Sequence, residues 1–105
     1  MTVHELKTWP PYFADIVYSG KTFEYRLNDR DYQVGDFLLL REFDPLARAY
    51  TGRECFRVVT YIAENIPGLP AGFCVMSIVK HGTMTGLEAH RLKVEAREKA
   101  REDRR

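Results

Sequence analysis

The chain has 105 residues, of which 45% are hydrophobic and 30% charged, and its formal net charge is +1. This size and composition suit one soluble globular domain. No apolar run approaches the roughly 20 residues of a membrane span, and the first residues lack the pattern of a secretory signal. Cys55 and Cys74 are far apart, so we expect reduced thiols in a cytoplasmic protein, without a zinc or redox motif.

The start of the chain predicts a short strand over residues 3–7 and then a helix. Pro10 and Pro11 suit the first helical turn, where their missing N–H groups have no partner to lose. Apolar residues then recur at helical spacing up to Gly20, which fits a left-handed C-cap. We therefore expect a helix over residues 11–19.

Strict alternation of polar and apolar residues predicts a half-buried strand over residues 22–27. Its two faces carry Phe23, Tyr25 and Leu27 on one side and Thr22, Glu24 and Arg26 on the other. Because apolar side chains favour burial, we expect the aromatic face to point inward and the charged face to point outward.

Three further runs predict strands, over residues 37–43, 54–62 and 73–80. The polar segments between them carry turn residues, and residues 51–53, "TGR", fit a hairpin turn. The order of one strand, one helix and four strands with short loops predicts an α+β fold. We expect a small mixed β-barrel with the helix packed at one end.

The last part of the chain differs in character. After residue 82 the sequence is rich in charges of both signs, and Glu95 and Lys99 have the i,i+4 spacing of helical ion pairs. Large apolar residues are missing from its end. We therefore divide the chain into a domain over residues 1–82 and a charged helical tail over residues 83–105 that frays toward its end.

The charged residues near the 22–27 strand are the most informative feature for function. Glu24 and Arg26 lie on one face of the predicted strand, about 7 Å apart by strand rise, and Lys21 lies just before them. A surface ion pair that contributes little to stability is one interpretation. The other is the wall of a binding groove, because Arg recognises phosphates and base edges and Glu accepts hydrogen bonds from exocyclic amines.

Gly20, Lys21, Glu24 and Arg26 resemble the G-x-K-x-x-E-x-R signature of the ASCH domain family, although the lysine here comes one residue earlier after the glycine. The blocks "HELK", "GKTFEYRLNDRDYQVGD", "LREFD", "YTGRE" and "GFCVMSI" resemble a branch found in phages and bacteria, over residues 3–80. The resemblance implies a PUA-like fold associated with RNA. It also implies an incomplete barrel whose cleft, between strands and helix, carries the charged cluster.

The partner implied by this resemblance is RNA or a modified nucleoside, with no cofactor. Arg30, in the "NDRD" turn, is expected at the rim of the cleft. Trp9 is either part of the core or an exposed stacking platform for a base. Arg53, in the predicted hairpin turn, is a further candidate for a phosphate contact. The three histidines have no metal-ligand spacing, so we expect no metal site.

Two other functions stay open at this point. One branch of the ASCH family hydrolyses the acyl group on N4 of cytidine, with a lysine, a threonine nucleophile and a glutamate. The position of that threonine is Glu24 here, and the nearest hydroxyl, Thr22, is displaced by one strand repeat. Lys21, Thr22 and Glu24 are thus candidates for catalysis without an assigned role. A protein-interaction module is the third reading.

Overall fold

The computed structural model describes residues 2–80. The elements in chain order are β1 (Val3–Thr8), α1 (Pro10–Tyr18), β2 (Phe23–Leu27), β3 (Phe37–Asp44), β4 (Ala49–Ala63) and β5 (Phe73–Val79). These elements confirm the predicted order of one strand, one helix and four strands. The predicted tail over residues 83–105, and with it the domain boundary at residue 82, lies outside the described residues.

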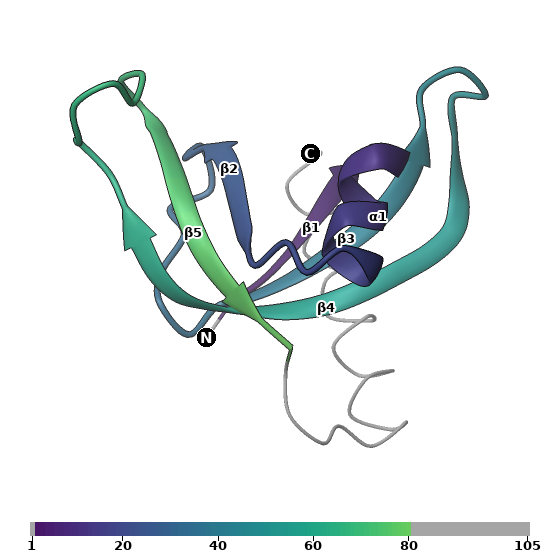
Figure 1. Ribbon diagram of the computed structural model, residues 1–105, viewed down its shortest axis with the longest axis horizontal. Coiled ribbons are helices and arrows are strands. Elements are labelled where there is room, and N and C mark those ends of the chain that lie inside the picture. The colour runs from purple at the N-terminus through teal and green to yellow at the C-terminus, as the bar shows by residue number, and fades with distance from the viewer. Residues whose placement is uncertain (1, 81–105) are drawn as a thin grey trace.

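The five strands form one sheet in the order β1-β3-β4-β5-β2. Only β1 and β3 pair in parallel, and the other neighbours are antiparallel. The sheet curls strongly, and α1 lies within the curve, beside the hairpin of β3 and β4 (Figure 1). The α+β class is therefore confirmed for residues 2–80, as a half-barrel with one short helix among them, in which the edge strands β1 and β2 are not sheet neighbours.

The apolar run at the start of β3 forms the centre of the fold. Leu38, Leu39 and Leu40 have no exposed surface. Leu38 and Leu40 belong to the larger core cluster, which also contains Ile16 of α1, whereas Leu39 packs on the other side of the sheet with Phe37. Since successive residues of a strand point to opposite faces, this run is buried on both sides, as its continuous hydrophobicity predicts.

The predicted hairpin turn at residues 51–53 is wrong, because β4 already begins at Ala49. The turn lies at residues 45–48. There the carboxylate of Asp44 accepts hydrogen bonds from the backbone N–H groups of Leu46, at 2.9 Å, and Ala47, at 3.3 Å. Residues 51–53 form a bulge inside β4, where Gly52 has a φ of +94°. Glycine adopts this left-handed conformation without strain, and both β-bulges and tight turns use it. The glycine that suggested a turn therefore forms a bulge here.

The predicted facing of β2 is also wrong. Phe23, Tyr25 and Leu27 are 47%, 46% and 49% exposed, whereas Glu24 is only 4% exposed. The curl of the sheet turns the polar face of β2 toward the hollow beside α1 and leaves the aromatic face outside. Tyr25 retains partial cover by stacking on Phe73 of β5, with ring centroids 5.2 Å apart.

A buried polar network fixes the start of β1 against the loop before β3. The carboxylate of Asp36 lies 2.8 Å from His4 Nε2 and accepts hydrogen bonds from the backbone N–H groups of Gln33 and Thr2. His4 also meets the ring of Tyr32 edge-on. Burial raises the pKa of Tyr32 to about 12, so this phenol is neutral at physiological pH. His4 is thus a structural residue in the core, 2% exposed.

The Asp36 network predicts a specific loss of stability in acid. Burial acts to raise the pKa of the Asp36 carboxyl, but hydrogen bonds from His4, Gln33 and Thr2 hold it below its ordinary value of 3.8. A carboxyl with a lowered pKa in the folded state stabilises the fold above its unfolded pKa, and this contribution disappears as the pH falls through the folded pKa. We expect Asp36→Asn to be less stable by roughly 1–3 kcal/mol at pH 7.

The measurement is urea unfolding of both proteins at a series of pH values from about 7 to 2. The stability of the wild type should fall more steeply than that of Asp36→Asn below about pH 4, because the variant lacks the titrating group. Parallel curves over this range would contradict the assignment.

Candidate functional site

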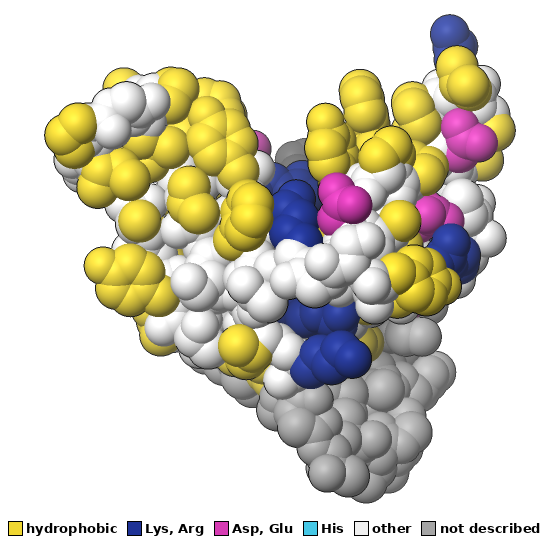
Figure 2. All heavy atoms as spheres, viewed as in Figure 1, with side chains coloured by type: hydrophobic (Ala, Val, Ile, Leu, Met, Phe, Trp, Pro, Cys, Tyr) yellow, Lys and Arg dark blue, Asp and Glu magenta, His cyan; other side chains and the backbone are white. Residues whose placement is uncertain are grey.

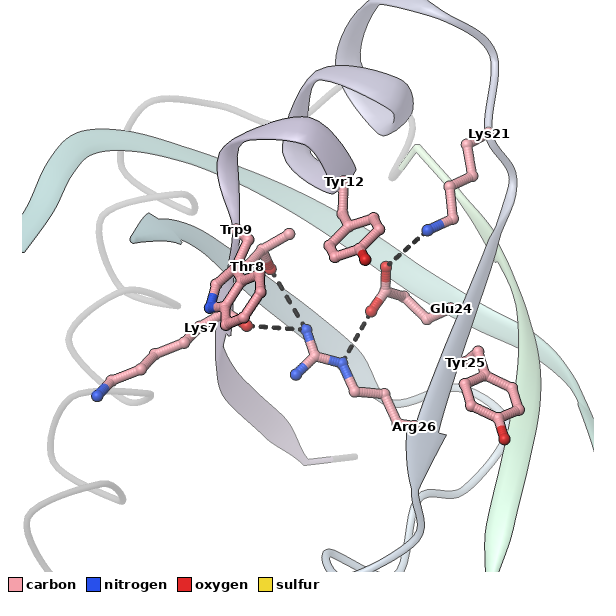
Figure 3. Close-up of a pocket in the computed structure, with 8 residues that line it drawn as sticks. All are labelled: Lys7, Thr8, Trp9, Tyr12, Lys21, Glu24, Tyr25 and Arg26. Atoms are coloured by element: carbon pink, nitrogen blue, oxygen red, sulfur yellow. Dashed lines mark hydrogen bonds and ion pairs between the residues drawn. The ribbon is translucent and has the colours of Figure 1, made fainter. Parts of the chain in front are cut away.

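The hollow of the half-barrel contains a pocket of about 430 Å³ where β1 ends, α1 begins and β2 passes alongside (Figure 3). Figure 2 shows a notch between two arms, of which the left one is largely apolar and the right one mixes apolar and charged side chains, with Lys, Arg and carboxylate side chains near its base. The residues that line the pocket are Lys7, Thr8, Trp9, Tyr12, Lys21, Glu24, Tyr25 and Arg26.

Glu24 is the buried charge of this pocket. Its Oε2 accepts a hydrogen bond from Arg26 Nε at 2.9 Å, and its Oε1 lies 4.0 Å from Lys21 Nζ. Glu24 and Arg26 share a face because they are two residues apart on a strand, and Lys21 reaches the same place from the turn before it. Two cations thus offset the cost of burying one carboxylate.

Arg26 connects the two edge strands of the sheet. Its Nη2 donates to the backbone carbonyl of Lys7 at 3.0 Å and lies 3.4 Å from the hydroxyl of Thr8. Figure 3 draws no contact from its other terminal nitrogen to the residues shown. The guanidinium is therefore fixed in position by three partners and keeps donor groups for a ligand.

Aromatic side chains surround the charges. Trp9 and Tyr12, at the start of α1, are 53% and 52% exposed, and Tyr12 extends toward Lys21 and Glu24 (Figure 3). Lys21 Nζ lies 5.3 Å from the ring centroid of Tyr12 and 5.1 Å from that of Phe23. Exposed ring faces beside fixed cations and a carboxylate form a site for a flat, polar ligand.

The structure brings together four of the residues singled out from the sequence, namely Trp9, Lys21, Glu24 and Arg26. It does not bring the others to this pocket. Thr22 and Arg30 are exposed and do not line it, and Arg53 lines a second pocket. Alternation predicts that Thr22 shares the face of Glu24, but Thr22 precedes the start of β2 at Phe23 and does not line the pocket. Its backbone carbonyl accepts a hydrogen bond from the backbone N–H of Ile78 in β5.

Four lining residues were not identified from the sequence: Lys7, Thr8, Tyr12 and Tyr25. Lys7 and Thr8 end β1, and one residue separates them from the prolines that begin α1. This strand–helix junction is the feature of the sequence that could have indicated them. Tyr25 was assigned to the interior because its strand was given the opposite facing. Tyr12 carries no signal beyond its place in the first turn of the helix.

Within the part of the chain that the structure describes, no group of His, Cys, Asp and Glu has the arrangement of a metal site. Among the same residues, no helix is long and apolar enough to cross a membrane.

The fold and site together define a small α+β half-barrel with a charged, aromatic pocket beside its helix. Residues 3–78 match the family model described as a domain of unknown function, DUF3850, and the chain belongs to this family. An uncharacterized 12.9 kDa protein in the GpA 3′ region of Escherichia phage P2 is 32% identical over 62 residues. These residues cover 59% of this chain and 55% of the phage protein, so the match spans about half of that relative.

The bridge made by Arg26 predicts that lysine cannot replace it. Lysine retains the positive charge beside Glu24 but lacks the planar fork that also reaches Lys7 and Thr8. We expect Arg26→Lys to lower the free energy of unfolding by about 1–2 kcal/mol, as measured by urea denaturation. Arg48→Lys, in the exposed turn at residues 45–48, is the matched control. Equal stability of the two variants would contradict the bridging role.

Proposed function

We propose that this pocket binds one nucleotide unit of single-stranded RNA, or a nucleoside derived from RNA. The observation that supports this most directly is the buried carboxylate of Glu24, which lies between Lys21 and Arg26 within a wall of exposed aromatic rings. The volume of about 430 Å³ falls within the range of small-ligand sites.

Each part of the pocket has a role in this binding. Trp9 or Tyr12 offers a ring face for stacking of the base, an interaction that every base can make. Glu24 Oε1, which lies 4.0 Å from Lys21 Nζ, accepts a hydrogen bond from an exocyclic amine. Arg26 and Lys21 donate to a base edge or to a phosphate.

The resemblance to the ASCH family supports the same function, and we extend the proposal to the fold. The curled five-stranded sheet with a helix at its open side is consistent with a PUA-like domain. The signature residues Lys21, Glu24 and Arg26 meet in the pocket, as a ligand-binding role requires. The proposal includes a cytoplasmic location for this binding.

Binding should depend on the pocket cations. We expect Lys21→Ala to weaken binding of a short single-stranded RNA and, if Lys21 contacts a phosphate, to reduce the slope of log K against log salt by about 0.7. Fluorescence anisotropy at several salt concentrations measures both effects. Arg48→Ala, an exposed cation outside the pocket, should leave both values unchanged, and an equal effect of the two changes would contradict the proposal.

A hydrolase acting on N4-acylated cytidine or on RNA is the second candidate, and a buried carboxylate near a lysine is the observation that favours it. Glu24→Gln separates the two candidates because it keeps the shape and removes the charge. In a binding protein it should change affinity or base preference modestly. In a hydrolase with Glu24 as general base, turnover should fall roughly 10²–10⁴-fold with binding retained.

The experiment incubates the protein with acylated cytidines and short RNAs, and follows product release and binding together. Binding without turnover supports the proposed function. Turnover that is lost in Glu24→Gln, or in Thr22→Ala despite its position outside the pocket, would establish the hydrolase instead. Failure to bind any of these probes would contradict both candidates and favour a protein-interaction module.

A further inference from the structure

A second pocket, of about 550 Å³, lies between α1 and β4 and shares no lining residue with the first. Its lining residues are Phe13, Val17, Tyr18, Gly52, Arg53, Glu54, Cys55, Arg57 and Lys80. Neither the charged cluster of the first pocket nor the proposed function accounts for it.

The second pocket has an excess of positive charge. Its lining contains three cationic side chains, Arg53, Arg57 and Lys80, and one carboxylate, Glu54. Arg41, outside this lining, already holds Glu54 with a hydrogen bond of 3.1 Å from its Nε. Burial raises the pKa of the Cys55 thiol above its ordinary value of 9.0, so the thiol adds no negative charge at neutral pH.

Arg57 is the most buried cation of this pocket, and its burial favours a negatively charged partner. Its residue is only 8% exposed, and its Nη1 donates to the backbone carbonyl of the preceding Phe56 at 2.8 Å. Among residues 2–80, no carboxylate lies within ion-pair distance of its guanidinium. A buried guanidinium without a counter-charge is costly.

The sheet register places a second cation next to Arg57. Val58 of β4 pairs with Val79 of β5 in an antiparallel ladder, so continuing this register by one residue puts Arg57 across from Lys80, just after β5 ends. Like charges directly opposite each other on a sheet are destabilising. An anion between the two side chains removes this repulsion and supplies the missing counter-charge.

Arg53 completes the site from the bulge of β4. Its guanidinium lies 5.1 Å from the ring centroid of Phe13 and 5.4 Å from that of Tyr18, and its Nη2 donates to the Tyr18 hydroxyl at 2.8 Å. Its ion pair with Glu42 is long, at 3.6 Å. The aromatic contacts orient the guanidinium and leave its remaining donors for a ligand.

We propose that Arg53, Arg57 and Lys80 form an oxyanion site that binds a phosphate group. Glu54 is paired with Arg41 and Glu42 offsets part of the charge of Arg53, so Arg57 and Lys80 supply the excess positive charge. This excess favours a doubly charged phosphate over a carboxylate ligand. The source of the phosphate is either free phosphate or the phosphate of a nucleotide. The site stands on its own residues and does not depend on the ligand of the first pocket.

The test titrates inorganic phosphate into the ¹⁵N-labelled protein at constant ionic strength, with sodium chloride making up the difference. We expect saturable shifts of the arginine Nε–Hε signals of Arg53 and Arg57. Lys80→Gln, at an exposed position, should weaken binding roughly tenfold or more, in line with the loss of one charge-assisted hydrogen bond. Arg48→Gln should bind phosphate as the wild type does.

Two further measurements distinguish free phosphate from a nucleotide as the ligand, and the second pocket from the first. Uridine 5′-monophosphate that binds here more tightly than inorganic phosphate identifies a nucleotide as the source, and the reverse order identifies free phosphate. Lys21→Ala should leave phosphate binding unchanged, which distinguishes failure of the first pocket from failure of the second. Absence of saturable shifts in the wild type, or an equal loss in Arg48→Gln and Lys80→Gln, would overturn the proposal.

Discussion

The contact on which the site depends is the one between the two edge strands of the curled sheet. Strands β1 and β2 stand at opposite ends of the strand order, yet Arg26 of β2 donates to the carbonyl of Lys7 in β1. The same guanidinium holds Glu24 in place. A hydrogen bond that crosses the open side of a half-barrel thus sets both the distance between the strands and the geometry of the pocket between them.

Most of the fold could be predicted from the sequence because its signals are local. The continuous run of β3 predicts a strand buried on both faces, and the prolines and Gly20 define the ends of α1 closely. The bulge at Gly52 could not be predicted, because glycine permits a positive φ in a turn and in a strand alike. Only the pairing of β3 with β4 decides between these two conformations.

The candidate site was predictable in part for a similar reason. The spacing of Lys21, Glu24 and Arg26 is local and indicates one cluster, which the structure assembles. The partners that come from β1 and α1 depend on how the sheet curls, and no local pattern reports this curl. The alternation of side chains along a strand establishes which residues of β2 share a face. Which of the two faces points into the hollow depends on the tertiary structure.

The facing of β2 has a consequence for the folding landscape. Hydrophobicity alone favours burial of its aromatic face, so the native arrangement, with that face exposed and Glu24 inside, is locally frustrated. Among residues 2–80, the strand pairs through its backbone with β5 alone, and its side chains add the stack of Tyr25 on Phe73 and the polar contacts around Arg26. Such a segment opens at a lower free energy than the core strands. A ligand in the neighbouring first pocket restrains β2, because this strand carries Glu24 and Arg26. Amide hydrogen exchange in β2 should therefore report most sensitively whether that pocket is occupied.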